Sequence, residues 1–351
     1  MSERYAAAEL IGFATRLFEC AGLDREKAET TARLLVEADL MGHTTHGLQL
    51  AGPYLERIEA GDMTKTGEPE VVADRGAALT WDGRYLPGIW LTARAIEVGL
   101  ERVQIHGLAA IVIRRSSHIG CLAAYLPRAT ERGCMVTIAS SDPSEASVAP
   151  FGGLRAAVTP DPIAIGIPTD DEPVLVDISA SISTNGFTGR CHKEGRRLPG
   201  RWVMDAAGQA SDDPAVLFTD PPGTILPMGG LEYGHKGYGL ALMIEALTQG
   251  LGGFGRADGA DRWGASVFVQ VIDPEAFGGL DAYRRQTGWL AAVCRANPPG
   301  PGVERVRLPG EGAFARKREA LEQGVELYPG IFGQLEGWAD KLGVTLPKPL
   351  G

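Results

Sequence analysis

The sequence lacks the features of several large classes of protein. It has only five cysteines, which are Cys20, Cys121, Cys134, Cys191 and Cys294. Their odd number and the lack of Cys-x-x-Cys spacing disfavour a disulfide framework or a zinc–thiolate site. Lys and Arg together number 34 against 44 for Asp and Glu, and the net charge of −10 argues against nucleic-acid or anionic-membrane partners. No apolar run reaches the ~18 residues of a membrane-spanning helix, and the first residues do not match a secretory signal. We therefore expect a soluble, acidic, cytoplasmic protein.

The order of hydrophobic patterns predicts an α/β (α+β) fold in two parts. With 351 residues the chain is long enough for more than one domain. Apolar residues at helical spacing predict helices over 10–21, 24–38, 54–58, 89–106, 235–249 and from 314 onward. Short β-type runs cover 77–81, 109–113, 135–139, 163–167, 174–178 and 266–272, with hairpin turns expected at Asp82-Gly83 and within 202–208. This order predicts a helical domain formed by 1–75 with 305–351, and a central sheet domain over 76–304.

One glycine run fits the dinucleotide-binding pattern GxGxxG on paper, from Gly250 to Gly255. That pattern binds phosphate where it leaves a strand and opens a helix. Here the run follows an apolar helix and precedes a loop, so we interpret it as a helix end. A conventional Rossmann site is therefore not expected.

Several polar residues follow predicted strands and helices. His46 lies in a Thr-Thr-His-Gly turn, and His118 lies in a Ser-Ser-His-Ile-Gly turn after a β-run. An imidazole in such a loop exchanges protons near neutral pH, although each histidine taken alone is more often structural. Asp177 ends an apolar strand and leads into a run of hydroxyls that offers donors to a cofactor. Lys236 lies in a cationic, glycine-rich helix start that suits an anionic ligand.

Taken in order, these segments resemble the malate/L-lactate dehydrogenase family of NAD(P)-dependent oxidoreductases, which is distinct from the Rossmann-fold lactate and malate dehydrogenases. The matching stretches run along nearly the whole chain: 38–47, 116–120, 148–153, 176–179, 199–202 with Asp205 and Gly208, 213–214, 228–230, 235–239 and 308–311. The resemblance implies a mostly antiparallel sheet domain that binds NAD or NADP in a non-Rossmann manner, beside a helical domain, in a homodimer. No metal is expected, because no His/Asp/Glu group has ligand spacing in the sequence.

The resemblance also assigns roles to residues. His118 and His46 are the candidate proton donors, and Asp177 is expected to orient or polarise one of them. Cofactor contacts are implied for the hydroxyl loop, the helix start and a Pro-Gly-Glu turn: Ser179, Ala180, Ser181, His235, Lys236, Pro309, Gly310 and Glu311. The predicted reaction is reversible hydride transfer between a nicotinamide and C2 of a small 2-hydroxy or 2-oxo acid, with a histidine as acid and base.

The sequence departs from the family pattern at the expected substrate pocket. Leu50 stands where many members have an arginine that clamps the substrate carboxylate, and a leucine cannot replace a bidentate guanidinium. We therefore predict a preference for 2-oxo acids with an apolar C3 substituent over oxaloacetate. Lys236 and Arg114 are the candidates to hold the C1 carboxylate.

Two further segments near this pocket are unusual. Asp161, within Thr-Pro-Asp-Pro, replaces the asparagine of the family's Gly-Thr-Asn-Pro segment. Extra residues before Ala149 leave either Ser141 or Ser144 as the substrate-facing hydroxyl. Two alternatives stay open: reduction of cyclic imino acids, which Leu50 does not exclude, and a cofactor-binding protein without catalysis.

Overall fold

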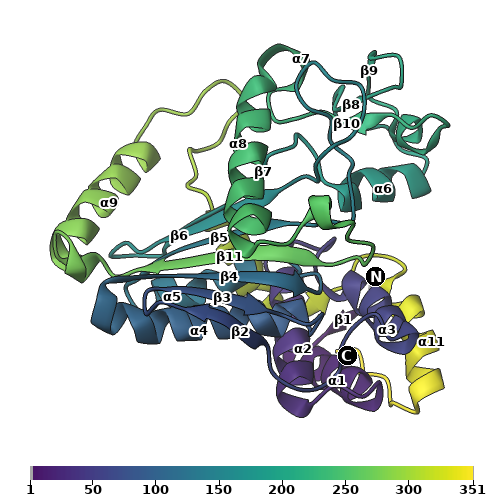
Figure 1. The fold of residues 1–351 in the computed structure, drawn as a ribbon, viewed down its shortest axis with the longest axis horizontal. Coiled ribbons are helices and arrows are strands. Elements are labelled where there is room, and N and C mark those ends of the chain that lie inside the picture. Colours follow the sequence, from purple (N-terminus) through teal and green to yellow (C-terminus); the bar gives the residue numbers. More distant parts are fainter. Residues whose placement is uncertain (1–2, 351) are drawn as a thin grey trace.

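A seven-stranded sheet crosses the molecule and carries helices on both faces (Figure 1). The computed structural model describes residues 3–350. The strands, in spatial order, are β2 Glu70–Asp74, β3 Ala78–Asp82, β4 Leu108–Ser116, β11 Ala265–Ile272, β5 Met135–Ser141, β6 Pro162–Ile167 and β7 Val174–Ser179. All neighbours pair antiparallel except β3 and β4, which run parallel. The mostly antiparallel sheet confirms the predicted fold class.

The helices divide between the two faces of this sheet (Figure 1). One layer contains α1 Ala7–Cys20, α2 Arg25–Leu40, α3 Ala51–Ala60, α4 Gly88–His106, α5 Pro127–Thr130, α10 Glu311–Gln323 and α11 Ile331–Leu342. The other layer contains α6 Asn185–Lys193, α7 Gly230–Tyr233 and α8 His235–Glu245. The remaining helix, α9 Leu280–Arg295, lies at the end of β6, where the Thr287 hydroxyl donates to the Pro168 carbonyl.

Side chains of the central strands alternate between two hydrophobic cores. In β4, Ile111 and Ile113 point into the core shared with α1 to α5, whereas Val112 points into the core beneath α6 and α8. In β11, Val267 and Phe268 divide in the same way. Because side chains alternate along a strand, a strand covered on both faces is apolar at every position. This is why β4 and β11 are readable in the sequence as largely apolar runs.

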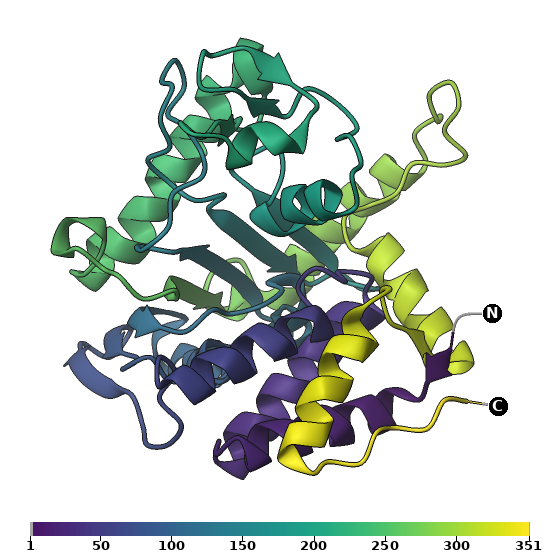
Figure 2. The ribbon, with the colours of Figure 1, turned by 90° about the vertical axis from the view of Figure 1, so that its right-hand side faces the viewer.

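Both ends of the chain build the helical layer. Helix α1 packs against α11 and α2 against α10, and β1 Arg4–Tyr5 pairs with β12 Val325–Glu326. The two termini lie on the same side of the molecule (Figure 2). This arrangement confirms a helical part formed from both termini. One continuous core joins these helices to the sheet, and the boundaries near 75 and 305 stay a prediction.

The structure confirms one predicted hairpin and corrects the other. Within 202–208, β8 Val203–Met204 turns into β9 Ala210–Ser211, and β10 Thr224–Ile225 completes a small sheet. The Asp82-Gly83 hairpin is wrong. Strand β3 instead pairs with the preceding β2, and after Asp82 the chain enters α4, which returns it parallel to β3 as β4.

Strand β2 and helix α9 are among the elements that the sequence analysis did not predict, and both bury little. All five residues of β2 are exposed, so the strand has no apolar alternation to detect. In α9 only Ala291 is buried. Among residues 3–350, no helix is both long enough and apolar enough to cross a bilayer.

Candidate active site

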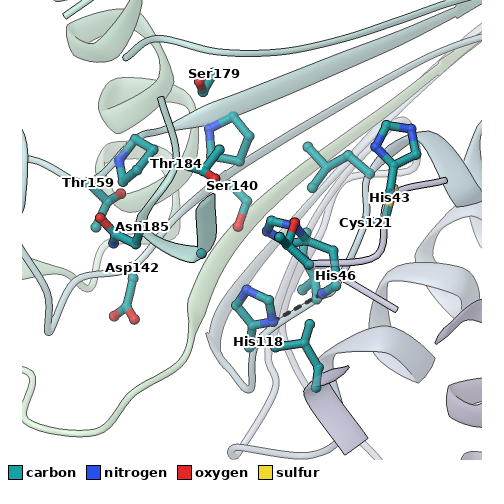
Figure 3. Close-up of a pocket in the computed structure, with 18 of the residues that line it drawn as sticks. His43, His46, His118, Cys121, Ser140, Asp142, Thr159, Ser179, Thr184 and Asn185 are labelled. Atoms are coloured by element: carbon teal, nitrogen blue, oxygen red, sulfur yellow. Dashed lines mark hydrogen bonds between the residues drawn. The ribbon is translucent and has the colours of Figure 1, made fainter. Parts of the chain in front are cut away.

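A cavity of about 630 Å³ opens at one end of the sheet (Figure 3). The antiparallel register brings the end of β5, the start of β6 and the end of β7 side by side, with Pro162 opposite Ser179. Because neighbouring strands alternate in direction, loops far apart in the sequence meet at this end. The lining residues come from segments 43–50, 118–122, 140–145, 159–162, 177–179, 184–186 and 263–264.

His118 is held on this wall by contacts to one of its ring nitrogens. Its Nδ1 lies 2.8 Å from the Tyr54 hydroxyl and accepts from the Gly120 N–H at 3.2 Å. The ring stacks on Trp263 with 4.9 Å between centroids. These contacts fix the ring plane and leave Nε2 for a ligand in the cavity. Tyr54 and Trp263 were missed in the sequence, because nothing in their local pattern distinguishes them from core aromatics.

His46 lies beside His118 in the same cavity, with 6.1 Å between the ring centroids. Its Nδ1 lies 2.8 Å from the hydroxyl of the adjacent Thr45. Burial is the main cause that lowers the pKa of His118 to about 3 and that of His46 to about 4. His46 lowers the pKa of His118 further, and His43 and Arg190 do the same for His46, since cations close together are unfavourable. Both rings are therefore neutral at pH 7 in the free protein.

Asp177 also lines the cavity, but its partners differ from those expected. Its carboxylate accepts from the Ala123 N–H at 2.9 Å and lies 3.9 Å from the Cys121 thiol. Burial raises its pKa to about 6. Within residues 3–350 its hydrogen bonds do not reach either histidine, so the group that orients His118 is Tyr54.

The structure also brings together three possible metal ligands that the sequence does not place near one another. The ligand atoms of His43, Cys121 and Asp177 all lie within 4.8 Å of one another. His43 follows α2, Cys121 follows β4, and Asp177 lies near the end of β7. Their spacing along the chain gives no local motif, and only the fold reveals the group.

The four predicted substrate residues occupy different places. Leu50 and Ser141 line the cavity. The Ser141 hydroxyl donates to Glu245 at 2.7 Å and accepts from Gln249 at 2.9 Å. Ser144 lies outside the lining and hydrogen-bonds Asp142, and Arg114 lies outside it as well, with Nε 3.0 Å from the Asp82 carboxylate.

The predicted cofactor residues form two groups around β7. Ser179 lines the cavity, and Ala180 and Ser181 follow it in a buried loop. The start of α8 packs on this loop, because a Cβ on Gly237 would lie 2.5 Å from the Ala180 carbonyl oxygen. His235 and Lys236 are exposed there.

The Pro-Gly-Glu turn lies at the other end of β7. The Pro309 carbonyl accepts from the Leu175 N–H at 3.0 Å. Gly310 precedes α10 with a φ of 97°, which favours glycine, and Glu311 pairs with Arg295. The turn is therefore outside the cavity lining. Gly250 to Gly255 end the helix that continues from α8, as the sequence indicated.

Asp161 lies directly behind the cavity wall. The side chain is 0% exposed, and its φ of 43° is one that aspartate and asparagine tolerate better than most residues. Oδ1 accepts from the Thr159 hydroxyl at 2.5 Å, and within the described chain Oδ2 is buried without a partner. Burial, with a contribution from Glu245, raises the pKa of Asp161 to about 7.

Comparison with known proteins gives consistent matches over the whole chain. A family model described as malate/L-lactate dehydrogenase matches residues 5–336. An L-lactate dehydrogenase from Cupriavidus necator is 29% identical over 327 residues, covering 91% of this chain and 92% of that protein. A malate dehydrogenase from Pyrococcus horikoshii is 28% identical over 343 residues, covering 95% and 94% of the two chains.

Solved structures agree with these matches. The structure of malate dehydrogenase from Pyrococcus horikoshii OT3 has a TM-score of 0.87 at 26% identity, covering 98% of this chain and 99% of that one. A Δ1-piperideine-2-carboxylate reductase from Pseudomonas syringae has a TM-score of 0.82 at 24% identity, covering 96% and 99%. The second likeness is one of fold alone.

Proposed function

The chain belongs to the malate/L-lactate dehydrogenase family of oxidoreductases, and from this premise we propose that it is an NAD(P)-dependent dehydrogenase that interconverts a 2-hydroxy acid and a 2-oxo acid. The observation that carries the proposal is the histidine pair at the cavity, with His118 fixed by Tyr54 and Gly120. A cavity of about 630 Å³ falls within the usual size range of small-molecule sites.

His118 is the proposed acid and base. In the reducing direction the imidazolium gives its Nε2 proton to the oxygen that becomes negative at C2, and the proton that remains on the ring lies on Nδ1, beside the Tyr54 hydroxyl. In the oxidising direction this Nδ1-protonated ring takes the substrate proton at Nε2. The low pKa of about 3 keeps the ring in its neutral form, the form that accepts a proton, in the free protein. An anionic substrate beside the ring raises this pKa, because a nearby negative charge favours the imidazolium. His46, whose Nδ1 lies 2.8 Å from the hydroxyl of its neighbour Thr45, is the second candidate.

The cofactor proposal rests on the region between the cavity and α8. When bound, the nicotinamide supplies or accepts the hydride. The residues fit such a group, because Ser179 lines the cavity and the helix start at α8 packs on the loop that follows. The positive end of α8 and the exposed Lys236 side chain suit the cofactor's phosphates. The resemblance also implies cofactor contacts for the Pro309 to Glu311 turn, which lies at the far end of β7.

The substrate carboxylate needs a partner other than an arginine at position 50. Arg114 is engaged by Asp82 away from the cavity. The first residues of α6, Asn185 and Gly186, do line the cavity, and the free N–H groups at a helix start favour an anion. We propose that this helix start holds the C1 carboxylate, while Leu50 faces an apolar C3 substituent.

We further propose a homodimer. Helices α8 and α9 expose large apolar side chains, among them Leu242, Met243, Trp289 and Leu290, each at least 46% exposed. Apolar surface of this kind is typical of contact with another chain. A dimeric mass by light scattering at micromolar concentration is expected, and a monomer would refute this part of the proposal.

The activity itself is tested with a substrate panel. The purified protein is mixed with NADH or NADPH and with phenylpyruvate, pyruvate, oxaloacetate or a cyclic imino acid, and cofactor absorbance is followed. The proposal expects turnover of a 2-oxo acid. Turnover of the cyclic imino acid alone would instead indicate a reductase of cyclic imino acids. Cofactor binding without any turnover would favour a cofactor-binding protein without catalysis. Lys236→Ala is expected to weaken cofactor binding, measured by NAD(P)H fluorescence.

A further inference from the structure

We propose that His43, Cys121 and Asp177 form a binding site for a borderline-soft divalent cation of the zinc class in the cavity wall. Their ligand atoms lie within 4.8 Å of one another, and the Cys121 sulfur is 3.9 Å from Asp177 Oδ2. Ligands of a tetrahedral zinc ion lie about 3.5 Å apart, given metal–ligand bonds of about 2.0 to 2.3 Å. The three side chains therefore need to approach by about 1 Å to enclose the ion.

The donor set selects the class of cation. An imidazole nitrogen, a thiolate sulfur and a carboxylate oxygen match the ligands of zinc and its neighbours, whereas magnesium and calcium prefer oxygen alone. A thiolate and a carboxylate together carry two negative charges, which a divalent cation balances within a partly enclosed wall. Charge balance of this kind lowers the cost of bringing ions out of water.

The surrounding backbone holds the three ligands in place before any ion binds. The Ala123 N–H donates to Asp177 Oδ2 at 2.9 Å, so the loop that carries Cys121 also orients the carboxylate. The His43 N–H donates to the Ala38 carbonyl at 2.8 Å, and the His43 carbonyl accepts from the His46 N–H at 2.8 Å. Such outer contacts support metal sites by fixing the ligands.

The site leaves one coordination position toward the cavity. All three residues are among those that line it, and Figure 3 places His43 and Cys121 together on one wall. Three protein ligands with an open fourth position is the arrangement of zinc sites that accept water or a small anion. The cation would therefore share the cavity with His118.

Cobalt titration of the full-length protein, without cofactor or substrate, tests this site. Co²⁺ binds to the same kinds of site as zinc, and a thiolate bound to it gives a charge-transfer absorption in the near ultraviolet. We expect one Co²⁺ per chain, displacement by Zn²⁺, and loss of the absorption in Cys121→Ser. Cys20→Ser, which changes an exposed free cysteine, is the matched control and should keep it.

A second variant keeps the thiol and tests the imidazole. His43→Ala should raise the Kd for Zn²⁺ by about tenfold or more, because one of three protein ligands is lost, with folding checked by circular dichroism. The proposal is overturned if the wild type gives no thiolate absorption, if the absorption persists in Cys121→Ser, or if His43→Ala binds Zn²⁺ as tightly as the wild type. Since no turnover is measured, none of these outcomes bears on the dehydrogenase proposal.

Discussion

Replacement of Asp161 by asparagine should stabilise the protein, and more so as the pH rises. Asp161 is fully buried, and burial raises its pKa from 3.8 to about 7. A carboxyl whose pKa is raised on folding opposes folding increasingly as the pH rises above the pKa of the unfolded chain, and the effect is complete above the raised pKa. An asparagine has nearly the same shape, tolerates the same positive φ and does not ionise.

The magnitude follows from the two pKa values. At pH 8 the difference between 3.8 and about 7 corresponds to about 4 kcal/mol against folding, and at pH 5 to about 1.6 kcal/mol. The free energy of unfolding of Asp161→Asn relative to wild type should therefore increase by about 2 to 3 kcal/mol between pH 5 and pH 8. Any gain or loss of neutral contacts is the same at both pH values and cancels in this comparison.

Urea unfolding at pH 5, 6, 7 and 8 measures this difference. Asp170→Asn is the matched control, since Asp170 is exposed and its replacement should give no comparable trend. A stability difference for Asp161→Asn that is constant with pH would refute the reasoning, because it would mean that Asp161 ionises in the folded protein as easily as in the unfolded chain.

Three further predictions concern the cavity. Tyr54→Phe removes the 2.8 Å contact to His118 Nδ1 and should lower kcat about fivefold with little change in KM, as expected for a hydrogen bond of about 1 kcal/mol that orients the ring. An unchanged kcat would count against Tyr54 as a positioning residue. Because the pKa of His118 is lowered to about 3, the protonated ring becomes rarer as the pH rises. The value of kcat/KM for 2-oxo acid reduction should therefore fall about tenfold per pH unit from pH 6 to 8. A flat profile would contradict His118 as the proton donor. Leu50→Arg should raise the ratio of kcat/KM for oxaloacetate to kcat/KM for phenylpyruvate by about 100-fold, because the guanidinium pairs with the second carboxylate of oxaloacetate. Leu50→Met is the apolar control. A wild type that already prefers oxaloacetate would contradict the apolar pocket.

Local patterns in the sequence predicted most of the fold. The run 109–113 is apolar throughout and 266–272 is apolar except at Ser266 and Gln270, and both lie in the centre of the sheet. Their burial therefore made them visible in the sequence. The prediction of a hairpin at Asp82-Gly83 was wrong because this composition suits both a hairpin turn and an entry into a helix. Only the pairing of β3 with the distant β4 decides between the two. Strand β2 is exposed along its length and leaves no pattern.

The candidate site divides in the same way. His46, His118, Asp177 and Leu50 stand in recognisable segments, and the structure places all of them on the cavity. The partners that tune them come from elsewhere in the chain. Tyr54 lies 64 positions before the histidine it contacts. Cys121 lies 56 positions before Asp177, and the folding of the sheet brings the two side chains together. Side-chain partnerships of this kind depend on tertiary packing and have no local sequence signal.

The most direct test of the account is the effect of His118→Ala on 2-oxo acid reduction. Turnover with NADH or NADPH and the best 2-oxo acid of the panel should fall by about 10² to 10⁴-fold, while the Kd of the reduced cofactor, measured by fluorescence without substrate, changes less than about twofold. A variant that keeps near-native turnover would contradict His118 as the proton donor and with it the mechanism proposed for this cavity.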